Sequence, residues 1–336
     1  MSAMRALLFS MALSGLAACA PVVQQAVPAP AGFAGPRIVE RPLGIGEFVV
    51  QDGASLPFLR WKTQGPPKAV VIALHGFNDH AASFRLAGPW WAEQGIEVWA
   101  YDQRGFGGAP NKGVWTDPEL SREDLRTVVA LVRARYPDTP IAVAGESMGG
   151  AIGITAFASA RPPQADRLIL LAPAVWGWSS QNPFSRIGLW TAAHIAPSRL
   201  VEPPSFATRR IRATDNVVEL LRNGRDPRFI LSSRFDALYG LVDLMEEASV
   251  NLAHVRVPTL LAYGASDQIV NKGATRLALD RARSNPNLTT AYYPNGWHLL
   301  NRDMDAQTVY ADVEAWLEGK SLPSGALPVR SAIERP

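Results

Sequence analysis

The chain has a single cysteine, Cys19, in 336 residues. One thiol can form neither an intrachain disulfide nor a zinc site built on several cysteines, so the fold must be stable without either. The chain also lacks a large excess of either charge, because it has 33 Lys and Arg residues and 30 Asp and Glu residues. It contains no dense basic block. This balance argues against nucleic-acid binding, and no nucleic-acid partner is expected.

A short repeat is missing as well, because the 27 Gly and 27 Pro follow no three-residue period, which excludes a collagen-like chain. Apolar content is ample. Hydrophobic residues make up 47% of the chain and charged residues 19%, which is enough to bury a full-sized core and excludes disorder as the main state. We expect one large domain that carries an insertion.

The N-terminal residues are typical of a secretion signal. Arg5 precedes an apolar stretch over residues 6–16, which is too short to cross a bilayer of about 30 Å. The sequence LAAC at residues 16–19 resembles the lipobox of bacterial lipoproteins. The resemblance implies a signal peptide over residues 1–18, acylation of Cys19 and, because Ala20 follows, an outer-membrane location facing the periplasm. The alternative is an ordinary cleaved signal peptide with an incidental cysteine.

Both ends of the mature chain are expected to lie outside the folded body. Residues 19–45 are rich in Pro and Ala, with little charge and no sustained periodicity. This composition favours a tether between the lipidated cysteine and the body. Residues 321–336 are expected to form a flexible tail.

Apolar runs and amphipathic segments alternate through the body. A hairpin is predicted around residues 52–53, with strands over 46–50 and 57–62. Further strands are predicted over residues 69–74, 96–101, 141–144, 168–171, 259–263 and 289–293. Helices are predicted notably over residues 122–135, 151–160 and 306–317. This alternation predicts an α/β fold with a mostly parallel sheet and helices on both faces.

One stretch breaks the alternation. Residues 175–250 contain no convincing buried strand, but they carry many aromatic residues among short amphipathic pieces. We expect a helical cap here, inserted between two parts of the core at residues 46–174 and 251–320. Most of the aromatic side chains would form the core of the cap, and a minority would face a pocket.

A candidate nucleophile follows the predicted strand 141–144. Residues 145–149 read GESMG, which matches G-x-S-x-G with Ser147 at its centre, and a predicted helix comes next. A serine at the tip of a tight strand-to-helix turn needs glycine neighbours, because the backbone is strained and adjacent elements pass close by. The start of the helix also directs N–H groups and a positive dipole end at the site, which favours an oxyanion.

Two further motifs come directly after predicted strands, HGF at residues 75–77 and DQRG at residues 102–105. Together with the serine turn they resemble the α/β-hydrolase superfamily, and within it the monoacylglycerol lipase and lysophospholipase-like branch. The likeness covers roughly residues 46–318 apart from the cap, and it implies an α/β-hydrolase fold with a Ser-His-Asp triad. One departure is NDH at residues 78–80, where that branch often has Gly-Glu-His.

Five histidines compete for the role of general base, for which imidazole has a suitable pKa. His298 lies between the last predicted strand and the terminal helix, where the superfamily carries its base. His75 is interpreted as shaping the loop beside the oxyanion hole, and His80 as a structural residue of the same loop. His194 and His254 are interpreted as polar contacts in or near the cap. His298 is therefore the predicted base.

The acid of a triad orients the imidazole and stabilises its charged form. Asp267 lies in the loop after the strand 259–263, where the resemblance places this acid. Asp102 competes, but its neighbour Arg104 suggests a structural ion pair, and Asp303 is interpreted as the start of the last helix. Asp267 is therefore the predicted acid.

The oxyanion hole is expected to consist of the backbone N–H groups of Phe77 and Met148. Glu146, beside the serine, is interpreted as orienting the turn or the cap and not as an acid/base group. No metal and no organic cofactor is implied.

These residues predict a serine ester hydrolase that works through an acyl-enzyme. The apolar, Trp-rich cap and the resemblance favour a small lipid-like ester, such as a monoacylglycerol or a lysophospholipid. Ser147 argues against the dehalogenases and epoxide hydrolases of the same fold, which use Asp at this turn. Thioesterase, peptidase and carbon–carbon hydrolase activities remain open, because the triad serves all of them. A catalytically silent binding protein of the cell envelope also remains open.

Replacing Cys19 with Ser should release the protein from membranes, because the acyl chains supply about 0.8 kcal/mol of anchoring per buried methylene. Fractionation of cells into membranes and soluble extract measures the change. Unchanged partition of the variant into membranes would rule out the lipoprotein interpretation.

Overall fold

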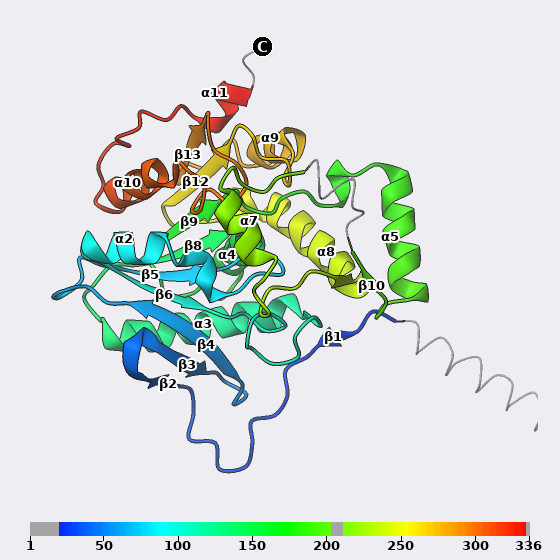
Figure 1. Cartoon of the computed structure of the whole chain (residues 1–336), viewed down its shortest axis with the longest axis horizontal. Helices are drawn as coiled ribbons and strands as arrows, with labels where there is room; N and C mark the ends of the chain where they lie inside the picture. Colours follow the sequence, from blue (N-terminus) through cyan, green and yellow to red (C-terminus); the bar gives the residue numbers. More distant parts are fainter. Residues whose placement is uncertain (1–19, 203–210, 334–336) are drawn as a thin grey trace, which may run out of the picture.

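The computed structural model describes residues 20–202 and 211–333, so the predicted signal peptide and Cys19 lie outside the described residues. A nine-stranded sheet crosses the centre of the molecule, with helices on both faces (Figure 1). In spatial order its strands are β13 (Leu288–Tyr293), β12 (Thr259–Gly264), β9 (Arg167–Leu171), β8 (Ile141–Glu146), β5 (Ala69–Leu74), β6 (Ile96–Tyr101), β4 (Ser55–Trp61), β3 (Ile45–Val49) and β2 (Arg37–Glu40).

The six strands from β13 to β6 are parallel to one another. Strands β4, β3 and β2 continue the sheet in antiparallel pairs. The prediction of an α/β-hydrolase fold with a mostly parallel sheet is confirmed. The predicted strands 69–74 and 96–101 coincide with β5 and β6, because both are apolar runs buried on two faces.

Alternate side chains of the strands form two separate cores. Val70, Ile72 and Leu74 of β5 belong to one core, and Val71 belongs to the other. The first core is covered by residues of α3, α4, α8 and α9, and the second by residues of α2 and α10. The helices are α2 (Ala87–Glu93), α3 (Pro118–Arg135), α4 (Met148–Phe157), α5 (Pro183–Ile195), α7 (Val217–Asn223), α8 (Phe235–Asn251), α9 (Lys272–Arg281), α10 (Ala306–Leu317) and α11 (Val329–Ile333).

Helix α3 begins four residues before its predicted start. The side chain of Asp117 accepts hydrogen bonds from the N–H groups of Glu119 and Leu120, and Pro118 occupies the first turn. A capping aspartate followed by proline is a strong start signal, because proline needs no N–H partner there. Periodicity alone missed this polar first turn.

The tether predicted over residues 19–45 is wrong where this segment pairs with the body, at residues 23–24 and 37–40. Strand β2 pairs with β3 at the edge of the sheet, and β1 (Val23–Gln24) pairs with β7 (Trp115–Thr116). The side chain of Glu40 also binds the buried Arg60 guanidinium, with 2.8 Å between Oε2 and Nη1. Pro/Ala-rich composition does not reveal such backbone pairing and charge neutralisation, which depend on distant segments.

The predicted flexible tail over residues 321–336 is likewise wrong as far as residue 333. Tyr292 donates its N–H to the carbonyl of Leu327 at 2.9 Å. Val329 in α11 is fully buried, and its N–H donates to Thr290 Oγ1 at 3.0 Å. Burial of apolar side chains therefore fixes this segment against the edge strand β13.

The insertion predicted over residues 175–250 is present, but the core resumes earlier than expected. Between β9 and α8 the described residues form η3 (Trp178–Ser180), α5, α7 and the short antiparallel pair β10 (Leu200–Val201) and β11 (Ser233–Arg234). Helix α8 packs on α4, and its Val242 and Leu244 belong to the main core. The sequence predicts these residues as part of the cap, because an amphipathic pattern does not show which layer a helix joins.

Arg104 has partners that the sequence did not suggest. Its guanidinium lies between Asp52, at 2.7 Å, and Asp124, at 2.5 Å, and all three side chains are buried. Asp102, the partner suggested by proximity in the chain, instead accepts the N–H of Ala81 at 2.8 Å. No helix among the described residues is long and apolar enough to cross a membrane.

Candidate active site

Ser147 sits between β8 and α4 in a strained backbone conformation, with φ of 50° and ψ of −113°. A Cβ atom at Gly145 would lie 2.4 Å from the backbone of Gly149, and one at Gly149 would lie 2.3 Å from the Leu74 carbonyl oxygen. Only glycine fits at these two positions, as the sequence motif predicted. The close packing therefore fixes the turn that presents the serine.

His298 and Asp267 are held together beside this turn. His298 Nδ1 lies 2.9 Å from Asp267 Oδ2, and both residues are buried. The other oxygen, Oδ1, accepts the N–H groups of Ile269 at 2.8 Å and Val270 at 2.9 Å. The carboxylate is thus fixed in orientation and favours a proton on Nδ1, which leaves Nε2 able to accept one.

The surroundings of His298 favour its charged form. Burial by itself lowers the pKa of the imidazole, but the charge and hydrogen bond of Asp267, together with the charge of Glu146, outweigh it. The net effect raises the pKa of His298 above its ordinary value.

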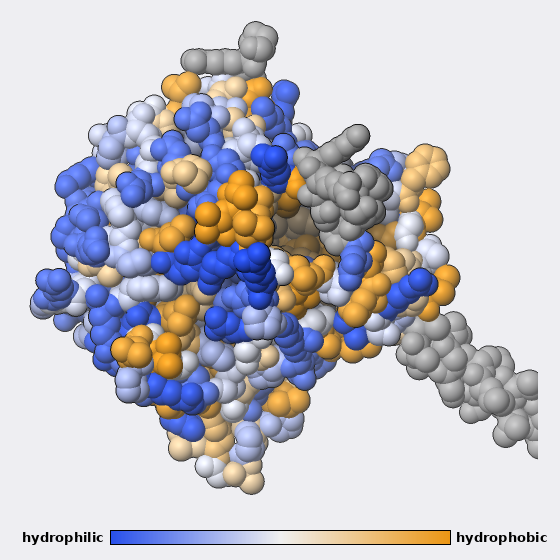
Figure 2. Space-filling view, in the orientation of Figure 1, coloured by the Kyte–Doolittle hydropathy of each residue, from blue (hydrophilic) through white to orange (hydrophobic). Residues whose placement is uncertain are grey.

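Ser147 and His298 line the same cavity, of about 510 Å³, between the sheet and the cap. Figure 2 shows this face of the molecule hollowed beside α7, with hydrophobic residues around the hollow. Most of the lining side chains are apolar: Phe77, Trp176, Leu220, Phe229, Leu231, Leu241, Met245, Ile269, Val270 and Leu299. The two reactive groups therefore lie at a largely apolar cavity formed jointly by the core and the cap.

Both predicted oxyanion donors lie close to Ser147, since Met148 follows it in the chain and a Cβ atom at Gly76, next to Phe77, would lie 3.4 Å from Ser147 Cβ. Met148 begins α4, so its N–H is among the first amides of the helix, which have no acceptor within the helix. Phe77 follows β5 and lines the cavity. Next to it, Asn78 has a φ of 67°, and the N–H of Asp79 donates to the Gly76 carbonyl at 3.3 Å, which closes the turn around Phe77.

His75 and His80 belong to the loop after β5, as the sequence interpretation placed them. His75 is fully buried, with Nε2 accepting the N–H of Gln103 at 3.0 Å and Nδ1 2.8 Å from the Gly76 carbonyl. Both ring nitrogens of His75 are thus occupied by the backbone. His80 Nε2 lies 3.0 Å from Asp226 Oδ2, which joins the loop after β5 to the cap.

Asp303, the other competitor for the acid, does not bind His298. Its Oδ2 accepts the N–H of Trp297 at 2.7 Å, and burial raises its pKa to about 7. Asp303 therefore binds the backbone of the loop that carries His298.

One charged residue beneath the site was not predicted from the sequence. Arg302 is fully buried and binds Asp79 at 2.8 Å and Glu146 at 2.6 Å. The predicted orienting role of Glu146 fits this contact. The sequence contains one signal for such a residue, namely the carboxylates of Asp79 and Glu146 next to the oxyanion and serine motifs. If both carboxylates are buried and ionised, they require a buried cation as partner.

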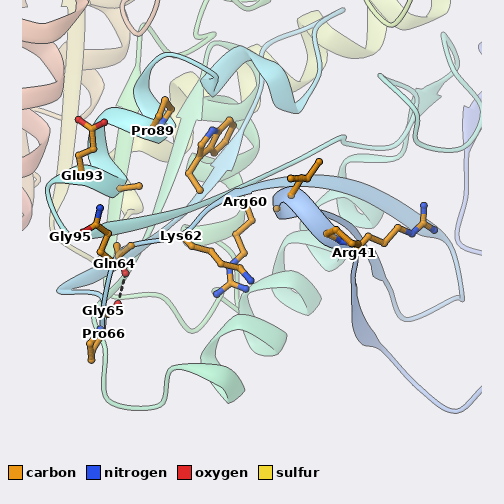
Figure 3. Close-up of a pocket in the computed structure, with 15 residues that line it drawn as sticks. Arg41, Arg60, Lys62, Gln64, Gly65, Pro66, Pro89, Glu93 and Gly95 are labelled. Carbon is orange, nitrogen blue, oxygen red and sulfur yellow. Dashed lines mark hydrogen bonds between the residues drawn. The ribbon is translucent and has the colours of Figure 1, made fainter.

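A larger cavity, of about 980 Å³, lies at the opposite ends of the strands (Figure 3). It is lined by residues 64–66, which precede β5, and by Gly95, which precedes β6. Its Arg60 and Lys62 are paired with Glu40. None of the predicted site residues lines it, so the smaller cavity is the candidate active site. Among residues 20–202 and 211–333, no three His, Cys, Asp or Glu side chains are grouped to hold a metal ion.

Comparisons with known proteins agree with this architecture. Residues 65–305 match the family model described as serine aminopeptidase, S33. A monoacylglycerol lipase of Mycolicibacterium smegmatis is 27% identical over 276 residues, covering 80% of this chain and 95% of the relative. The monoglyceride lipase of Mus musculus is 27% identical over 287 residues, covering 83% and 92%.

A solved structure shares the fold. It is a soluble variant of the monoglyceride lipase of Saccharomyces cerevisiae in complex with a substrate analogue, with a TM-score of 0.66 and 19% identity. The match covers 88% of this chain and 98% of that one. Since the family model spans more than half of the sequence, the chain belongs to the serine aminopeptidase S33 family and has the α/β-hydrolase fold.

Proposed function

We propose that this protein is a serine carboxylic ester hydrolase that acts on small lipid-like esters. The observation that carries the proposal is the position of Ser147 and the His298–Asp267 pair at one apolar cavity. A serine hydroxyl is a poor nucleophile until a base removes its proton, and a fixed, neutral imidazole is suited to that task.

The proposed reaction has two halves. Ser147 Oγ attacks the ester carbonyl while His298 Nε2 takes its proton, and the N–H groups of Phe77 and Met148 stabilise the oxyanion. The carbon–oxygen bond to the alcohol then breaks, and the alcohol leaves with the proton from His298. A water molecule repeats the sequence on the acyl-enzyme, which releases the acid and restores the serine.

The substrate class follows from the cavity. Its volume of about 510 Å³ and its lining of aliphatic and aromatic side chains suit an acyl chain. The names of the two relatives, monoacylglycerol lipase and monoglyceride lipase, support the same class. A monoacylglycerol is therefore the preferred candidate, and a lysophospholipid is the second lipid ester to test.

We also propose attachment to the bacterial outer membrane through Cys19, facing the periplasm. The described chain begins at Ala20, and the N–H of Val22 donates to Asp236 Oδ2 at 3.2 Å. In Figure 1 this start lies on the side of the molecule that carries α5. Helix α5 exposes Phe184, Ile187 and Ile195, so an anchor here would bring an apolar helix close to the lipid.

Replacing Ser147 with Ala should lower kcat for ester hydrolysis by a factor on the order of 10⁶, because the nucleophile is removed. Hydrolysis of a p-nitrophenyl ester measures the loss, and a fluorophosphonate probe should label the wild type but not the variant. Ser185→Ala, at an exposed position in α5, is the matched control and should keep full activity. A silent binding protein would show neither hydrolysis nor labelling in the wild type.

Activity should fall as the pH decreases through the pKa of His298, because only neutral imidazole can take the serine proton. Since the pKa of His298 is raised, the acid limb of kcat/KM should have its midpoint above about 6.5. Asp267→Asn should lower kcat by about 10⁴-fold and move this midpoint to lower pH. A flat profile down to pH 4 would contradict an imidazole base.

Catalytic efficiency should rise with acyl length, by up to about fourfold per added methylene, until the cavity is filled. The measurement is kcat/KM for p-nitrophenyl esters of increasing length, with a monoacylglycerol, a lysophospholipid and an amino-acid p-nitroanilide in parallel. Preference for the anilide would favour an aminopeptidase and overturn the lipid-ester proposal.

A further inference from the structure

Arg302 lies four residues after His298 and has no role in the proposed reaction, yet it is fully buried beneath the active site. A buried cation is strongly unfavourable unless it is paired. Its Nη1 lies 2.8 Å from Asp79 Oδ2, and its Nη2 lies 2.6 Å from Glu146 Oε1. Both partners are themselves buried, so the three side chains form one desolvated cluster.

The two carboxylates lie close in the chain to the two proposed oxyanion donors, Asp79 in the loop after β5 and Glu146 at the end of β8. Asp79 is two residues after Phe77, and Glu146 directly precedes Ser147, which is followed by Met148. One guanidinium thus connects its own segment, after β13, with the loop after β5 and the end of β8, which are far apart in the sequence. A planar guanidinium can bind two carboxylates in fixed directions, which an ammonium group cannot do.

The carboxylates of Asp79 and Glu146 also make close contacts around the turn that carries Phe77. Asp79 Oδ1 accepts the N–H of His80 at 2.8 Å, while the N–H of Asp79 closes the turn on the Gly76 carbonyl. A Cβ atom at Gly76 would lie only 3.1 Å from Glu146 Oε1. The Glu146 carboxylate is therefore in close contact with the loop that carries Phe77, and displacement of one would displace the other.

Arg302 is also fixed to the loop of the base. Its N–H donates to the Leu299 carbonyl at 2.7 Å, and its own carbonyl accepts the side-chain N–H of Asn216 at 3.0 Å. The guanidinium and the imidazole therefore belong to one short, internally bonded segment.

The cluster also contributes to the electrostatics of His298. Asp267 and Glu146 act on the imidazole from the loop after β12 and from the end of β8, and Arg302 and Asp303 act on it from its own segment. The Glu146 charge raises the pKa of His298, and the Arg302 charge lowers it. Arg85 and Arg222, from the loop after η2 (Ala81–Phe84) and from α7, are further positive charges near Arg302.

We propose that Arg302 is a positioning residue, which binds Asp79 and Glu146 at once and thereby holds the Phe77 and Met148 amides in register with His298. The inference rests on the proposed function, since that function assigns the oxyanion and base roles.

The first test compares Arg302→Met and Arg302→Lys with the wild type on one ester. Misplacing the oxyanion donors should lower kcat on the order of 10²-fold. KM should change by less than about threefold, because Arg302 does not line the cavity. Lys should not restore kcat, since it lacks the fork. A kcat of Arg302→Met within threefold of the wild type would overturn the proposal.

Arg104→Met is the matched control, because Arg104 is also buried between two carboxylates, but neither it nor those carboxylates line the candidate cavity. Both Met variants should lose Tm, and only Arg302→Met should lose kcat. Equal loss of kcat in the two variants would show that Arg302 only stabilises the fold, and it would overturn the positioning role.

A triple variant covers the case in which Arg302→Met does not fold. Asp79→Asn, Glu146→Gln and Arg302→Met together remove all three charges, so no uncompensated charge remains buried. Its Tm should recover towards the wild type while kcat stays low. Recovery of kcat along with Tm would overturn the proposal.

A second readout does not depend on hydrolysis. Glu146→Gln should lower the pKa of His298, measured by NMR titration of labelled histidine with His298→Ala as the assignment control, whereas the exposed Glu93→Gln should not. An unchanged pKa in Glu146→Gln would contradict the electrostatic contribution of the cluster.

If the wild type hydrolyses no ester, the proposed function fails, whereas an active wild type with an equally active Arg302→Met defeats only this inference.

Discussion

The structure depends on a steric constraint at the end of β8. Side chains at positions 145 and 149 would collide with the backbone of the turn and with Leu74 of the neighbouring strand β5. Their absence allows α4 to pack directly onto the sheet and holds Ser147 at a φ of 50°. The serine is thereby presented at the carboxyl ends of the parallel strands, where the loops after β5, β8, β12 and β13 meet.

Everything else in the site is arranged around that point by buried polar contacts. Asp267 orients His298 from one loop, while Arg302 joins the loop of Phe77 to the end of β8, directly before Ser147. These charges are tolerated in the interior because each is paired, and an interior of low polarity strengthens each pairing. The site is therefore a small ionic cluster beneath an apolar cavity, which suits the proposed reaction, because that reaction develops charge on an ester bound by its acyl chain.

The cap completes the cavity without belonging to the sheet. It provides aromatic and aliphatic lining residues, among them Trp176 and Phe229, and it contacts the loop after β5 through His80 and Asp226. The N–H of Ile230 also donates to the carbonyl of Asn78 at 2.9 Å. The segment NDH, which departs from the resembled branch, is thus one of the segments that bond the cap to the core.

Local sequence determined much of this protein. Apolar runs such as residues 69–74 form buried strands, because burial removes their apolar side chains from water. The GESMG turn needs glycine at two positions, because side chains there would clash with the backbone. The chain order of Ser147, Asp267 and His298 also led to a pair that the structure brings into contact. Tertiary structure alone decided which layer α8 joins, that residues 37–40 add a strand, and that Val329 anchors the C-terminal segment. It likewise decided the partners of Arg104 and Arg302, because a buried charge is neutralised by whichever carboxylates the fold brings near it, and these lie up to 223 positions away in the sequence.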